Sequence, residues 1–175
     1  MKWMFNTEYG LEDAVIGGIK TSTRREAFKH DFHDFNTRMD KDNHLCVYDG
    51  DLLVHRSKCA LSQEIKVARR YSSIYPTGHH LKSTAGWDNK MFTSEEFLPD
   101  SIIVTDIRCE RIQDIHFDDI MREGIYIENG FYTFRNGKPQ VYPRRAFEEL
   151  IKKVCDAKTW DDNPHVIAYK FRKKG

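Results

Sequence analysis

The chain has 175 residues, of which 28 are basic and 27 acidic, and its formal net charge is +1. This balance excludes a protein that coats nucleic acid through overall positive charge, so any contact with phosphate has to be local. Hydrophobic residues make up 39% of the chain and aromatic residues 13%, which excludes an intrinsically disordered protein. The length fits one domain with a sizeable core.

Cysteine and histidine residues do not form a metal-binding pattern. The four cysteines are widely spaced and include no Cys-x-x-Cys pair, which argues against a zinc ribbon and indicates reduced structural thiols. Four histidines lack cysteine or carboxylate partners at ligand spacing, namely His30, His33, His44 and His55. We therefore expect no bound metal, and the chemistry considered below needs no organic cofactor.

No segment of the sequence has the properties of a membrane or targeting signal. The N-terminal stretch MKWMFNTEYG turns polar after five residues, unlike a signal peptide. No apolar run approaches the roughly 20 residues that cross a bilayer. We expect a soluble, cytoplasmic protein that does not bind membranes.

The first 25 residues predict a strand, a helix and a second extended segment. Residues 2–6 (KWMFN) are apolar enough for a short strand. In residues 7–18, Leu11, Ala14 and Val15 would share one face of a helix that ends near Gly17-Gly18. The following KTSTRR is rich in residues that favour strands or helix caps.

Residues 26–90 give a less regular pattern. The charged stretch 26–44 indicates an inserted helix or loop, whereas LCVYDGDLLVHR at 45–56 predicts a hairpin around Asp49-Gly50. Residues 62–75 fit a strand or a helix equally well, and residues 76–90 read as a loop.

The second half of the chain contains the clearest elements. β-Branched residues predict a strand at 101–115, and a short helix follows that ends near Gly124. Asn-Gly pairs at 129–130 and 136–137 indicate an inserted hairpin. Pro143 opens a helix whose apolar stripe includes Phe147 and Leu150, and residues 164–174 form the last strand. This order predicts an α+β domain with a mixed, curved or barrel-like sheet and helices at its rim.

Four positions near the N-terminus carry a resemblance to a known family. Gly18, Lys20, Thr23 and Arg25 spell Gly-x-Lys-x-x-Thr-x-Arg, which resembles the signature of the ASCH domains, relatives of the PUA RNA-binding modules. Residues 102–125 are similar to a strand-then-helix segment of that family that ends in an acidic residue before glycine, here Glu123-Gly124. Residues 48–54, with their Gly-Asp, and residues 156–171, with a Trp-x-x-Asn-Pro turn, extend the likeness.

The resemblance covers the chain from end to end and departs from the family in three inserted stretches, near 26–44, 71–90 and 126–142. It implies a single PUA-like domain over residues 1–175, with a mixed or antiparallel β-barrel whose cleft receives RNA or a nucleoside-sized ligand. Some small ASCH proteins are amidohydrolases that deacylate N4-acetylcytidine with a lysine, a threonine and a glutamate. These positions match Lys20, Thr23 and Glu123. Other members have been considered RNA-binding or RNA-cleaving modules.

The residue types around Lys20 fit either a functional site or a solvent-exposed charged surface. Lys20 and Thr23 would meet in a helical turn but face opposite sides of a strand, unless the preceding Gly-Gly bends the chain. A lysine can act as base beside a hydroxyl if burial or the neighbouring Arg24 and Arg25 lower its pKa. Glu123 at a helix C-terminus opposes the helix dipole, which hints at another use.

Two functions remain open at this point. In the first, Lys20 and Thr23 activate attack on an acylated cytidine-like base, Glu123 transfers the proton, and Arg24 and Arg25 bind the substrate. In the second, the same cleft holds RNA or a modified nucleotide without chemistry, and the arginines contact phosphate. In either case an aromatic ring would stack the base, with Trp87 and Tyr71 as candidates. A regulatory protein that keeps the fold without the activity is a third possibility.

Overall fold

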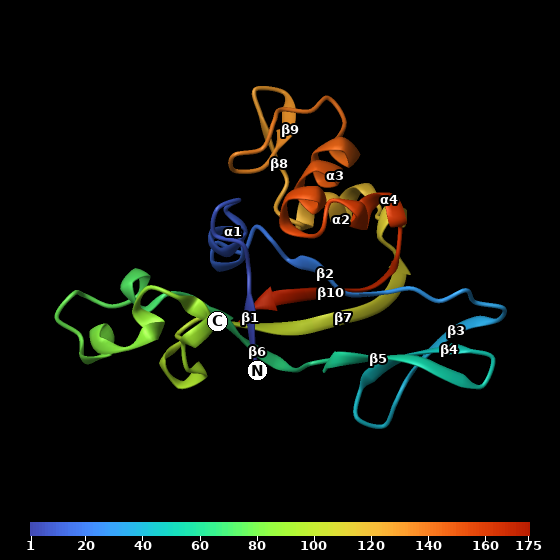
Figure 1. The fold of residues 1–175 in the computed structure, drawn as a ribbon, viewed down its shortest axis with the longest axis horizontal. Helices are drawn as coiled ribbons and strands as arrows, with labels where there is room; N and C mark the ends of the chain where they lie inside the picture. The colour runs from blue at the N-terminus through green and yellow to red at the C-terminus, as the bar shows by residue number, and fades with distance from the viewer.

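The computed structural model describes residues 1–175, and its largest element is a five-stranded mixed sheet (Figure 1). The strand order is β1-β6-β7-β10-β2. β1 and β6 are parallel, and all other neighbours are antiparallel. The strands span Lys2–Met4 (β1), Ser22–Phe28 (β2), Glu64–Ala68 (β6), Ser101–Arg111 (β7) and His165–Lys173 (β10). The ambiguous stretch 62–75 therefore contains a strand, and the predicted strands at 2–6, 101–115 and 164–174 are confirmed.

A second sheet projects from the body as an arm (Figure 1). It has the order β3-β4-β5, with β3 at Phe35–Met39, β4 at His44–Asp49 and β5 at Leu52–Ala60. The hairpin around Asp49-Gly50 is confirmed, and Gly50 has the positive φ of 56° that favours glycine. The helix or loop expected at 26–44 is wrong. β2 continues to Phe28 and β3 follows, but all five residues of β3 are exposed, so no buried face marks it in the sequence.

Glu26 attaches the arm to the main sheet. It lies at an irregularity in the β2–β10 pairing and has a positive φ of 57°. Its carboxylate accepts a hydrogen bond from the hydroxyl of Tyr169 and one from the backbone N–H of Lys58 at 3.0 Å. It also lies 3.0 Å from Nε2 of His55. The arm is thus held partly by polar contacts, which are themselves only partly buried.

The helices and a small hairpin lie on one side of the five-stranded sheet (Figure 1). The helices are α1 (Leu11–Ile16), α2 (Phe117–Arg122), α3 (Pro143–Val154) and α4 (Lys158–Asp162), and the hairpin is β8 (Tyr126–Glu128) with β9 (Phe131–Thr133). The predicted helices and this hairpin are confirmed, whereas α4 was not predicted. α3 buries Phe147, Leu150 and Ile151 in a core cluster of 26 residues. No helix has the length and apolar composition needed to cross a membrane.

The loop expected at residues 76–90 is part of a longer segment, residues 71–97, that folds into a series of short 3₁₀ turns. These are η1 (Tyr71–Ser73), η2 (His80–Ser83), η3 (Ala85–Trp87), η4 (Lys90–Phe92) and η5 (Glu95–Phe97), and a further turn, η6, follows β7 at Ile112–Asp114. The segment has a separate core of four buried residues, which are Ala68, Tyr71, Leu81 and Leu98.

The sheets do not close into a barrel. β1 and β2 are the edges of the five-stranded sheet, and no hydrogen-bonded ladder joins that sheet to β3-β4-β5. The two sheets are joined by side-chain contacts: Leu45, Val47 and Cys59 of the arm belong to the main core, and Glu26 bonds to the arm as described above. The α+β class is therefore observed, whereas the β-barrel that the family resemblance implies does not close.

Candidate active site

A cavity of about 200 Å³ lies between β1, the start of β2 and α3. Its polar lining comes from Asn6, from Lys20 and the first residues of β2, and from the end of α2. Its apolar lining comes from β1 and the residue after it, α1 and α3. The residues concerned are Met4, Phe5, Asn6, Leu11, Lys20, Thr23, Arg24, Arg25, Glu123, Leu150, Ile151, Val154 and Cys155. The cavity thus brings together all four charged or hydroxyl residues that the signature and the Glu-Gly pair single out, together with Arg24.

The turn after α1 brings Lys20 into the interior. Gly18 has φ +73°, and the backbone N–H groups of Ile19 and Lys20 both donate to the carbonyl of Ala14, at 2.8 and 2.9 Å. This is the bend that the Gly-Gly pair predicts. Because β2 begins only at Ser22, Lys20 and Thr23 are not bound to strand alternation, and both line the cavity.

Lys20 is buried and fully hydrogen-bonded, with an exposed fraction of 2%. Its Nζ donates to the carbonyl oxygens of Ser22 at 2.7 Å and Glu123 at 2.9 Å. The third bond goes to Oε2 of Glu123 at 2.5 Å, between residues 103 positions apart. Burial lowers the pKa of Lys20, and the nearby Arg24 and Arg25 lower it further, against the opposing effect of Glu123.

Glu123 is held from its other side by Arg24. Oε1 of Glu123 accepts from Nη1 of Arg24 at 2.7 Å, and the same guanidinium donates through Nε to Glu110 at 2.7 Å. Arg24 has a side-chain exposure of 1%, and a third carboxylate, that of Asp119, lies 3.7 Å from its Nη2. Nη2 of Arg24 is buried without a hydrogen bond but lies 2.6 Å from Oε1 of Glu110. The guanidinium is therefore surrounded by carboxylates of the protein, and its position suits holding Glu123 rather than contacting a ligand.

The backbone after α2 gives Glu123 its position. Gly124 has φ +99°, which L side chains rarely adopt, and a Cβ there would lie 3.1 Å from Leu11 and 3.7 Å from the Lys20 stem. The glycine therefore allows the end of α2 to approach α1 and Lys20 closely.

Arg25 lies along the aromatic residues of β1 and the segment after it. Its guanidinium carbon is 4.5 Å from the ring centre of Trp3 and 5.1 Å from that of Phe5, and Nη2 donates to the carbonyl of Met4 at 3.0 Å. Burial lowers the pKa of Arg25. Its Nε is buried and has no hydrogen-bond partner. A buried donor without an acceptor is unusual in a folded protein.

Thr23 differs from its neighbours because its hydroxyl is uncommitted. The residue is 93% buried, pairs with Tyr169 across the β2–β10 ladder and lines the cavity. Its side chain forms no hydrogen bond with any other residue, including Lys20.

Tyr71 and Trp87 lie outside this cavity. Tyr71 belongs to the separate core of the 71–98 segment, with its hydroxyl accepting from the N–H of Ser94 at 2.5 Å, and Trp87 packs against the same cluster. Both rings are used for packing there. The apolar wall that faces Lys20 instead comes from Phe5 and from α3, including Leu150, which sequence reasoning did not assign to the site.

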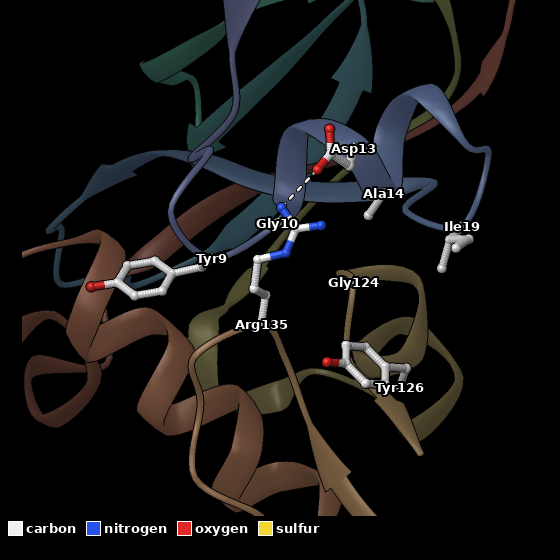
Figure 2. A pocket seen from close by; sticks show the side chains of 8 residues that line it. All are labelled: Tyr9, Gly10, Asp13, Ala14, Ile19, Gly124, Tyr126 and Arg135. Carbon is white, nitrogen blue, oxygen red and sulfur yellow. Dashed lines mark hydrogen bonds and ion pairs between the residues drawn. The ribbon is translucent and has the colours of Figure 1, made fainter. Parts of the chain in front are cut away.

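A second hollow of about 290 Å³ lies on the other side of Gly124 (Figure 2). Figure 2 shows Arg135 reaching across it toward Asp13 on α1, with Tyr9 and Tyr126 on opposite sides of the guanidinium. Nη1 of Arg135 and Oδ2 of Asp13 are 2.7 Å apart, and both side chains are about half exposed. An exposed pair of this kind adds little to stability.

No group of three or more histidine, cysteine, aspartate or glutamate side chains is arranged to hold a metal ion. The polar side chains that line the cavity supply an amine, a carboxylate, a hydroxyl, two guanidinium groups, an amide and a thiol. A comparison of the chain with known protein families, curated proteins and solved structures gives no match.

Proposed function

We propose that this protein is an amidohydrolase that removes an acyl group from the exocyclic nitrogen of a cytidine-like base. One observation carries the proposal: Lys20 and Glu123 form a buried pair at 2.5 Å in a cavity that also holds the free hydroxyl of Thr23. Buried charges are costly, and titratable groups with perturbed pKa values in a cavity are more common at functional sites than elsewhere.

The hydrogen bonds of Lys20 suit a group that exchanges a proton with Glu123. Two of its N–H groups point at backbone carbonyls, which stay in place whatever the charge of the amine. The third points at Oε2 of Glu123. A neutral amine has two N–H donors, so it keeps both carbonyl bonds after the third proton moves to the carboxylate. Burial, which lowers the pKa of Lys20, favours that neutral form.

The proposed reaction has two stages. Oγ of Thr23 attacks the acyl carbonyl, the neutral amine of Lys20 takes the hydroxyl proton, and Glu123 delivers a proton to the departing nitrogen. The C–N bond breaks, which releases the free amino group of the base and leaves an ester on Thr23. Water then hydrolyses the ester with the same base, which yields a carboxylic acid and restores the hydroxyl.

The two arginines have different roles in this proposal. Arg24 positions Glu123 through the contact at 2.7 Å and is itself fixed by Glu110. The unpartnered Nε of Arg25 would gain an acceptor if a small movement brought a carbonyl oxygen of the substrate to it. The buried state of Arg24 is also the reason that we favour catalysis over a cleft that grips phosphate with both arginines.

The cavity volume limits what enters. At about 200 Å³ it is smaller than the range of about 300–1,000 Å³ typical of pockets for drug-sized ligands. We therefore expect the acyl group and one edge of the base to occupy the cavity, with the sugar outside, near the exposed Met4 and Cys155.

The test is turnover of N4-acetylcytidine and related acylated nucleosides. Thr23→Val removes an unbonded hydroxyl, so we expect a folded variant that binds but has lost nearly all turnover. Lys20→Arg keeps a positive charge that cannot act as base, and we expect a loss of about 10²–10⁴-fold. Lys29→Arg, at an exposed pair, is the matched control.

Turnover by the wild type should fall at high pH, where the Lys20–Glu123 pair loses the proton that Glu123 delivers to the departing nitrogen. Full turnover by Thr23→Val would exclude the threonine as nucleophile. A wild type that hydrolyses none of the acylated nucleosides, yet binds short RNA in a salt-dependent way, would instead indicate the non-catalytic binding module.

A further inference from the structure

β3 is an open edge of the arm. It pairs with β4 on one side only, and all five of its residues are exposed. In Figure 1 the arm extends away from the helices and from the five-stranded sheet. The β3–β4 register runs without a bulge from Phe35 opposite Asp49 to Met39 opposite Leu45, and β3 contains neither proline nor lysine. A bulge, a proline or a lysine usually protects an edge strand from pairing with another chain, and β3 has none of the three.

The backbone bonds at the two ends of β3 show which residues face outward. The carbonyl of Asp34 accepts from the N–H of Gly50, and the N–H of Asp40 donates to the carbonyl of His44, so both even-numbered residues point at β4. Along an antiparallel strand this direction alternates from one residue to the next. Phe35, Thr37 and Met39 therefore present their N–H and C=O groups to the open side.

The sequence of β3 is complementary to itself about Thr37. In an antiparallel pair centred there, Phe35 lies opposite Met39 of the second copy, and Asn36 lies opposite Arg38 of the second copy. The first pairing places two half-exposed apolar side chains together, with exposures of 44% and 40%; the ring of Phe35 also packs against Phe32 and His165 of its own copy. The second places an amide beside a guanidinium on the other face of the strand. Three outward residues on each strand give six backbone hydrogen bonds.

We propose that β3 pairs antiparallel with β3 of a second copy of this chain, with a two-fold axis at Thr37. The two arms then form one continuous six-stranded sheet, and the exposed edge disappears. The same register places Asp34 opposite Asp40 of the second copy, which opposes pairing. Asp40 is partly neutralised, since its carboxylate lies 2.6 Å from Nε of Arg56.

The size of this contact indicates a weak, reversible dimer. A ladder of five residues covers much less than the about 800 Å² per partner that stable interfaces bury. Association therefore depends on backbone hydrogen bonds, and Asp34→Asn should strengthen it by removing one member of each like-charged pair. Asp31→Asn, which removes the same charge outside β3, is the matched control for a general effect of net charge.

Disulfide trapping tests the register directly. In the proposed pair, Thr37 faces its own copy with a Cα separation of about 5.5 Å, within the range of about 4.4–6.8 Å that disulfides bridge. In a background that carries Cys155→Ser, which removes the exposed thiol, Thr37→Cys should oxidise to a covalent dimer. Asn36→Cys and Arg38→Cys should each fail alone but cross-link when mixed.

Sedimentation equilibrium gives an independent measurement. We expect the wild-type mass to rise with concentration toward a dimer, and Thr37→Pro, which removes an outward N–H from an edge strand, to stay monomeric and folded by circular dichroism. Equal cross-linking of Asn36→Cys and Thr37→Cys would overturn the register. A wild type that is monomeric at every concentration, together with no Thr37→Cys disulfide, would overturn the proposal, as would a Thr37→Pro variant that is folded but dimerises normally.

Discussion

Lys20→Met tests whether the lysine is a buried charge held by the fold. Methionine keeps the length and the apolar stem of the side chain, and it leaves the carbonyls of Ser22 and Glu123 without their donor. An unsatisfied buried acceptor costs about 1–3 kcal/mol, and removing one partner of a buried ion pair typically costs about 3–5 kcal/mol. We expect the free energy of unfolding at pH 7 to fall by about 3–5 kcal/mol, because Arg24 still partners Glu123 and limits the loss.

The effect should depend on pH in a defined direction. Burial lowers the pKa of Lys20 in the folded protein, whereas the unfolded chain keeps a value of about 10.4. Between those two pKa values the unfolded state binds more protons, so wild-type stability rises with pH by up to about 1.4 kcal/mol per unit. The methionine variant lacks this group. The difference in unfolding free energy between wild type and variant should therefore grow as the pH is raised through that window.

Urea unfolding of both proteins at a series of pH values from 7 to 10 measures this difference. Titrating groups that the two proteins share contribute equally to both unfolding free energies, so their contributions cancel. Lys29→Met is the control, because Lys29 pairs with Asp162 at 2.8 Å with side chains 70% and 44% exposed. It should change stability by no more than about 1 kcal/mol. A Lys20→Met variant as stable as this control, or a difference that shrinks toward pH 10, would refute the buried, pKa-lowered lysine.

Two further predictions concern the scaffold. A Cβ at Gly86 would lie 2.5 Å from the ring of Tyr71, so Gly86→Ala should lower the thermal stability of the protein, whereas Gly78→Ala meets open space and should not. Burial would raise the pKa of Asp119, but Arg108 outweighs it and brings the pKa to about 2. The stability that this carboxylate adds over Asp119→Asn should be complete above about pH 4 and disappear as the pH falls toward 2, which acid unfolding curves of the two proteins would show.

Elements with a clear internal period could be predicted from the sequence, and elements defined by their neighbours could not. α3 has an apolar stripe and Pro143 at its start, and β7 is a run of β-branched residues, so each carries its own signal. β3 is exposed on both faces and exists only because β4 pairs with it. The open arrangement of the sheets depends in the same way on long-range pairing, which residue patterns do not encode locally.

In the candidate site, too, some features follow from the local sequence and others depend on contacts between distant segments. The bend at Gly18 that frees Lys20 from strand alternation was predictable from Gly-Gly. The proximity of Glu123 to Lys20 came from a family resemblance, since nothing local connects residues 103 positions apart. Arg24 was expected to bind substrate, but three surrounding carboxylates engage its guanidinium. Aromatic composition likewise does not say which core a ring such as Tyr71 will join.

The pairing of β2 has a consequence for biosynthesis. β2 carries Thr23 and has only β10 as a strand neighbour, in a ladder that joins residues 22–28 to residues 165–170. At about 5–20 residues per second, a ribosome makes β10 roughly 7 to 28 seconds after β2. During that time β2 has no partner strand, and contacts so distant along the chain form slowly. The cavity is therefore among the last parts of the molecule to assemble, and a nascent chain without β10 would have the residues of the site but not its geometry.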